Sequence, residues 1–81
     1  MKNLSEFSST IRMFAFLIKD GYSVSRAVEI LAQQSAGDIG KMFAKASQLL
    51  KTGASTADAF ASAGFPKELC AIASVGEKSG Y

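Results

Sequence analysis

The side chains that could carry out acid–base or nucleophilic chemistry are few in this 81-residue chain. There is no histidine, which removes the commonest general base and the commonest metal ligand, and there is a single cysteine, Cys70. The seven carboxylates are Glu6, Asp20, Glu29, Asp38, Asp58, Glu68 and Glu77. General acid–base catalysis needs titratable groups paired in a cleft, whereas helix caps, helix ends and solvated helix faces explain the first six of these positions.

Cys70 lies within the apolar stretch Leu69–Ile72. Because no histidine can activate its thiol, we expect it to be a small buried hydrophobic residue rather than a nucleophile. The chain also has no Gly-x-x-x-x-Gly-Lys-Ser/Thr run that could hold phosphates. The sequence therefore predicts a protein that is not an enzyme, with no catalytic residue, no metal site and no cofactor.

The positive charges are too few and too dispersed to predict nucleic-acid binding. The net charge is +2, and the nine basic residues are spread from Lys2 to Lys78. One alternative is a helix-turn-helix DNA-binding or regulatory domain, because GYSVSRAVEIL has a glycine turn before a second helix. That helix would offer only Arg26 to DNA, with Glu29 repelling the phosphates. Lys41 and Lys45 form a modest basic stripe, which is either a solvated face or a docking face for an acidic partner.

Composition and hydropathy favour one small folded domain. The apolar fraction is 48%, and a lone cysteine excludes an internal disulfide and favours a reducing compartment. The longest wholly apolar run, residues 13–18, is far shorter than the roughly 20 residues that cross a bilayer. Because the chain stops at Tyr81 with nothing resembling a terminator, we expect residues 1–81 to be one domain of a larger protein.

Apolar residues at helical spacing predict five helices, with apolar stripes over about 7–18, 24–31, 39–50, 57–61 and 69–76. The expected inward-facing residues are Phe7, Ile11, Phe14, Leu17, Ile18, Val24, Ala27, Val28, Leu31, Ile39, Met42, Phe43, Ala46, Leu49, Leu50, Leu69, Ile72, Ala73 and Gly76, and the short fourth helix is expected to run through Ala57, Phe60 and Ala61. These stripes predict an all-α fold, a small antiparallel helical bundle of about five helices.

Turn and cap residues separate the five expected helices. Glycines just past a periodic stretch end three of them, at Gly21, Gly53 and Gly64, and Gly21 and Gly53 are expected in the left-handed conformation that favours glycine. Helix starts are predicted at the following residues: Asn3 or Ser5, Ser23, Asp38, Ser55 with Asp58 as a capping box, and Pro66 in the first turn of the last helix.

A repeat underlies this pattern. GYSVSRAV from Gly21 and GASTADAF from Gly53 lie thirty-two positions apart and share glycine, serine and alanine at the same places. The same shift superimposes the apolar residues of the preceding helices, with Leu17 matching Leu49 and Ile18 matching Leu50. The bundle is therefore expected to be built on two helix-turn-helix repeats, whose apolar stripes pack against each other.

Two further motifs follow these turns along the chain, first Phe65-Pro66 and then the closing run GEKSG, which starts at Gly76. In that order the chain resembles, over about residues 7–81, the first cytoplasmic domain of the type II secretion F and type IV pilus assembly platform proteins. The resemblance implies a multi-pass inner-membrane protein without catalytic activity, whose helical cytoplasmic domain couples an assembly ATPase to pilin or pseudopilin extraction. Implied partners are that ATPase, other platform subunits and further copies of the chain, and no nucleic acid.

The resemblance also assigns roles to particular residues. Gly76, Glu77, Ser79 and Gly80 follow the family signature and are expected to order the junction to a sixth helix or to bind a partner. Acidic residues in some relatives would suit a divalent cation there, but one carboxylate, Glu77, does not provide the six or more oxygens of such a site. The short segment before the first helix favours a type IVb-like pilus system, and an apolar run of about twenty residues encoded after Tyr81 would support the platform assignment.

Overall fold

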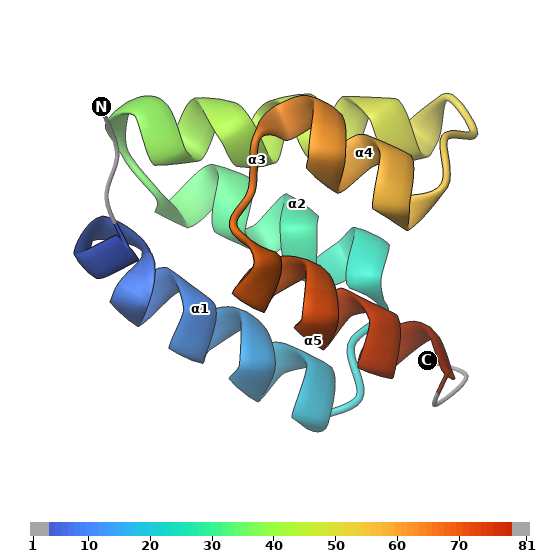
Figure 1. The fold of residues 1–81 in the computed structure, drawn as a ribbon, viewed down its shortest axis with the longest axis horizontal. Helices are drawn as coiled ribbons and strands as arrows, with labels where there is room; N and C mark the ends of the chain where they lie inside the picture. Colours follow the sequence, from blue (N-terminus) through green and yellow to red (C-terminus); the bar gives the residue numbers. More distant parts are fainter. Residues whose placement is uncertain (1–3, 79–81) are drawn as a thin grey trace.

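The computed structural model describes the backbone of residues 4–78 and the side chains of residues 7–76. This part of the chain forms five helices and no strand (Figure 1): α1 (Leu4–Lys19), α2 (Val24–Gln34), α3 (Gly37–Lys51), α4 (Thr56–Ala63) and α5 (Lys67–Lys78). The predicted all-α fold is confirmed.

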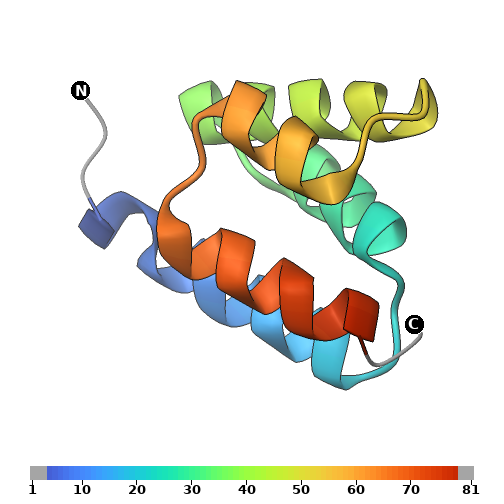
Figure 2. The same ribbon diagram turned by 45° about the vertical axis from the view of Figure 1, so that its right-hand side comes forward.

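Consecutive helices reverse direction, and the two views show α3 with α4 on one side of the bundle and α1 with α5 on the other (Figures 1 and 2). α2 joins the two sides and packs most extensively against α3. Because the helices alternate in direction, the first, third and fifth all point the same way. Where the fifth helix packs against the first, the two must therefore be parallel. α1 and α5 are accordingly parallel, with the Phe7 ring against Phe65 at one end and Ile18 against Gly76 at the other.

Aromatic rings connect the two sides through the core. Phe65, from the Phe-Pro motif between α4 and α5, lies at the centre of this cluster. Its ring centroid is 4.5 Å from Phe43 of α3, 4.8 Å from Phe60 of α4 and 6.5 Å from Phe7 of α1. Phe60 in turn lies 5.9 Å from Phe14. Such tilted and edge-on pairs add to the stabilisation from burial, so this cluster fixes how the helices pack.

The two predicted glycine turns have the same conformation. Gly21 and Gly53 have φ angles of 104° and 101°, in the region that side chains with a Cβ rarely adopt. In the first turn the N–H of Tyr22 donates to the Leu17 carbonyl at 3.0 Å, and the corresponding bond in the second turn measures 3.1 Å. This is the Schellman arrangement, and it satisfies carbonyls that the end of each helix leaves unpaired.

The serines that follow these glycines cap the next helices as predicted. Ser23 and Ser55 have nearly identical backbone angles, with φ of −67° and −68° and ψ of 159° and 158°. Each Oγ accepts a hydrogen bond of 3.1 Å from the backbone N–H three residues on, at Arg26 and at Asp58. The repeat thus holds in three dimensions from the end of one helix to the start of the next.

Three predicted helix starts shift or fall outside the described residues. Asp38 as the cap of α3 is wrong: the Gly40 N–H already bonds to the Ala36 carbonyl, so Ala36 is the cap and Asp38 lies in the first turn, near the positive end of the helix dipole. Pro66 precedes α5 by one residue, and its carbonyl accepts the first helical hydrogen bonds. Ser5 lies inside α1 and is not its cap, while Asn3 lies outside the described residues.

Candidate functional site

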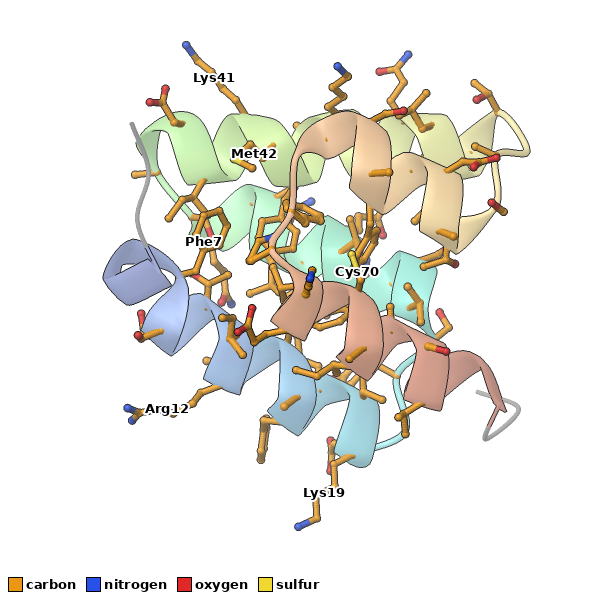
Figure 3. All side chains as sticks on the ribbon, in the orientation of Figure 1. Phe7, Arg12, Lys19, Lys41, Met42 and Cys70 are labelled. Atoms are coloured by element: carbon orange, nitrogen blue, oxygen red, sulfur yellow. The ribbon has the colours of Figure 1, made fainter. Side chains whose placement is uncertain are left out.

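The exposed side of α3 carries the two lysines that the sequence singles out. The apolar residues of this helix turn inward, and Phe43 and Ala46 are fully buried. Positions 41 and 45 are four apart, so both fall on the opposite side and both are exposed. Lys41 extends away from the bundle (Figure 3), and neither it nor Lys45 forms an ion pair with another described residue.

A shallow groove of about 260 Å³ lies between α2 and α3, and one of its lining residues, Ala44, is the neighbour of Lys45 in the chain. Small side chains, Ala32 and Ala44 with Ser47, form part of its lining, and Gln33 and Gln48 supply amide groups. Small residues allow a partner's backbone to approach closely, and amides hydrogen-bond to its polar groups. We refer to Lys41, Lys45 and this groove together as the α3 face.

An ion-pair cluster closes one end of the groove. Glu29 of α2 accepts a hydrogen bond from the Arg26 guanidinium at 2.6 Å, and the Lys51 ammonium of α3 lies 3.3 Å from its other carboxylate oxygen. These two interactions, with Arg26 first, lower the pKa of Glu29 below its ordinary value of 4.5. Glu29 therefore stays ionised at neutral pH and bridges α2 to the C-terminal end of α3.

The cluster also determines which charges remain for a partner. Arg26 and Lys51 share the carboxylate of Glu29, whereas the charges of Lys41 and Lys45 are not compensated by an ion pair with any side chain of residues 7–76. Two such ammonium groups attract a partner's carboxylates and speed its encounter.

The helix-turn-helix alternative is weakened by the same cluster. α2 would be the recognition helix, and Arg26 is its one candidate cation. Arg26 is bound to Glu29, whose carboxylate would face the DNA phosphates beside it. A DNA-binding helix needs cations free to replace the counterions of the phosphates.

The glycine that opens the family signature has a structural explanation. Gly76 is buried in α5, and a Cβ added there would lie 3.0 Å from Ile18 Cγ2, 3.3 Å from Ile18 Cδ1 and 3.4 Å from Val24 Cγ2. The absence of a side chain lets α5 approach the end of α1 and the start of α2 closely. The side chain of Glu77, together with Ser79 and Gly80, lies outside the described residues.

The remaining predicted residues are structural or isolated. Turns and helix starts are formed at Gly21, Ser23, Gly53, Ser55 and Pro66, and Asp58 lies in the first turn of α4. Cys70 is half-buried and lines a cavity of about 110 Å³ between α4 and α5. Within the described part of the chain, no three His, Cys, Asp or Glu side chains are grouped as a metal site would require.

Sequence reasoning missed two features. Gly40 is buried so closely against the turn before α3 that an added Cβ would overlap the Ser35 carbonyl. The one sequence signal for this close contact is that position 40 falls on the inner side of the helix. Phe16 is 60% exposed and Met13 41% exposed. Both fall outside the helical stripe of Phe7, Phe14 and their neighbours, so the periodicity itself could have identified an exposed apolar face.

The family model described as type II secretion system (T2SS), protein F, matches residues 10–81, which include all of α2 to α5 and most of α1. No curated protein and no solved structure matches the chain. None of the helices described here is both long enough and apolar enough to span a bilayer.

Proposed function

The chain belongs to the type II secretion system protein F family, and from that premise we propose that it is a cytoplasmic domain coupling an assembly ATPase to subunit extraction. Proteins of this family are non-catalytic components of inner-membrane secretion machinery. In the proposal the whole protein is a multi-pass inner-membrane platform of a type IV pilus or type II secretion machine. The pilin or pseudopilin would be reached through its membrane-embedded part.

The α3 face is the observation that supports this role. It combines uncompensated cations, a groove lined partly by small residues and amides, and a rigid helix packed on an aromatic core. A coupling domain needs such a surface on a body that does not deform when its partner moves. We propose that acidic side chains of the ATPase dock against Lys41 and Lys45, with a loop or helix of the partner entering the groove beside them.

The test is a titration of the 81-residue chain with a purified assembly ATPase from the same organism, at two salt concentrations. Reversing both charges in Lys41→Glu/Lys45→Glu should weaken binding about tenfold or more, because two attractions become repulsions. Lys67→Glu is the matched control, since Lys67 is an exposed lysine on α5, and it should change affinity less than twofold. Equal affinities for all three proteins, or no binding by the unchanged chain, would contradict the proposal.

A titration with duplex DNA separates the helix-turn-helix alternative. If the proposal is right, the chain shows no binding to duplex DNA of the kind that weakens steeply with salt. A steep salt dependence, lost in Arg26→Ala, would favour DNA binding instead.

A further inference from the structure

Exposed apolar side chains are concentrated away from the three middle helices. Among the described residues the large exposed hydrophobics are Met13, Phe16, Tyr22 and Val75, and none of them lies on α2, α3 or α4. Phe16 and Met13 share the outer face of α1, where they line a wide, open depression of about 450 Å³ with Ser9 and Arg12. One exposed apolar side chain is ordinary, but a phenylalanine and a methionine side by side on an outward helix face indicate a contact surface.

Two cations lie beside Phe16 on the same face. Arg12 lies four residues before Phe16 and Lys19 lies three residues after it, and side chains at these spacings are neighbours on a helix surface. Both are exposed, and both extend away from the bundle (Figure 3). Neither forms an ion pair with any side chain of residues 7–76. The outer face of α1 therefore has an apolar centre with an uncompensated cation toward each end.

This combination is complementary to a bilayer surface that contains anionic phospholipids. Apolar side chains enter the boundary between the headgroups and the acyl chains, and the long side chains of arginine and lysine reach back to the lipid phosphates. The opposite side of α1 is already occupied, because Phe7, Phe14 and Ile18 are buried in the core. The helix would therefore lie along the membrane surface, with the rest of the bundle above it.

We propose that the outer face of α1 docks this domain on an anionic phospholipid surface, with Phe16 and Met13 inserted and Arg12 and Lys19 on lipid phosphates. The inference goes beyond the proposed function and uses a different face of the molecule. Arg12 and Lys19 extend from the side of the bundle opposite to Lys41 (Figure 3). A bilayer beneath α1 would therefore leave the α3 face open to a protein partner.

Asp20 distinguishes a lipid surface from a protein interface. Its backbone N–H donates to the Phe16 carbonyl at 2.9 Å, so position 20 continues the row that Arg12 and Phe16 begin. Its carboxylate opposes anionic lipid, and each elementary charge near such a surface changes binding about fivefold. Asp20→Asn should therefore bind anionic vesicles about fivefold more tightly. A protein partner that pairs a cation with Asp20 predicts weaker binding for the same variant.

Co-sedimentation of the 81-residue chain with vesicles tests the docking. The unchanged chain should bind vesicles of equal parts phosphatidylglycerol and phosphatidylcholine about fivefold more tightly than vesicles of phosphatidylcholine alone, and added salt should reduce the difference. Arg12→Glu/Lys19→Glu should weaken binding to the anionic vesicles by at least about twentyfold. Lys41→Glu/Lys45→Glu is the matched control, because it makes the same change in net charge. It should weaken binding less than about threefold, since the shortest dimension of the bundle is 21 Å and the Debye length is roughly 10 Å at about 0.1 M salt.

A tryptophan probe tests which side chain enters the lipid. The chain has no tryptophan, so Phe16→Trp introduces a single one at the centre of the outer face of α1. Ala44→Trp, at an exposed position of α3, is the control. With anionic vesicles the emission of Phe16→Trp should shift to the blue and become protected from a water-soluble quencher, whereas that of Ala44→Trp should not change. Circular dichroism of every variant confirms that the helices remain.

The proposal is overturned if the unchanged chain does not bind anionic vesicles at millimolar lipid or binds neutral ones equally well. Equal losses for the two double charge reversals, or an emission of Phe16→Trp that lipid does not shift, would also overturn it. Failure on both kinds of vesicle would assign the outer face of α1 to a protein partner. ATPase binding at the α3 face is measured without lipid, so either proposal can fail while the other stands.

Discussion

Gly76 offers the sharpest test of the packing, because two effects of opposite sign compete there. Replacing a glycine inside a helix by alanine stabilises the helix by about 1 kcal/mol when the new methyl group has room. At Gly76 it does not, since the added Cβ would lie 3.0 Å from Ile18 Cγ2 and 3.3 Å from Ile18 Cδ1. Ile18 is itself 6% exposed and has little space to move away.

Overpacking of this kind typically costs about 1–3 kcal/mol, because buried side chains must leave their preferred rotamers. After the gain in helix propensity is subtracted, Gly76→Ala should be destabilised by about 1 kcal/mol. For a domain of this size that corresponds to a melting temperature lower by about 4–8 °C. Urea denaturation with an unchanged slope would show that stability alone has changed.

A second substitution shows whether the loss comes from Ile18. Ile18→Val removes Cδ1, one of the two atoms that the new methyl group would crowd. Gly76→Ala should therefore cost less in the Ile18→Val background than in the unchanged chain, a coupling that the double-mutant cycle measures. If Gly76→Ala instead raises stability by about 1 kcal/mol, as propensity alone requires, the close approach of α5 to α1 is refuted.

The turns and the ion-pair cluster give three further predictions. Gly21→Val and Gly53→Val should each lower the free energy of unfolding by about 1–2 kcal/mol and by similar amounts, because the φ angles agree and an added Cβ meets nothing within 4 Å. Unequal losses in denaturant melts would contradict the equivalence of the two turns. Ser23→Ala and Ser55→Ala should each cost about 1 kcal/mol, with glycine at either position costing less, as thermal melts would show. Since the pKa of Glu29 is lower in the folded chain, its stabilisation is present above about pH 4.5 and disappears as the pH falls through the folded value. Glu29→Gln should flatten the loss of stability in acid, and an unchanged pH profile would show that the two ion pairs contribute nothing.

The architecture could be predicted because its determinants are local. Helical spacing of apolar residues, and glycine and serine at the turns, depend only on neighbours along the chain, and the structure reproduces both turns of the repeat. One helix boundary depended on packing as well as on local sequence. Ala36 and Asp38 lie two residues apart, and the choice between them depends on how tightly Gly40 packs against the preceding turn.

The close approach at Gly76 could not be derived from spacing. It depends on the distance between α5 and α1, which are separated by most of the chain and meet because five alternating helices close on themselves. The groove of the α3 face has the same origin, since Gln33 of α2 and Gln48 of α3 line one groove only after α2 packs on α3. Local patterns placed the lysines on α3, and tertiary packing supplied the groove beside them.

The core explains how the α3 face is held in place. The Phe65 ring packs against Phe43, on the buried side of the helix that carries the α3 face, and against Phe7, near the start of α1. Interiors packed at this density transmit a displacement rather than absorb it. If the ATPase docks on the α3 face as proposed, a displacement of that face would therefore carry α1 with it.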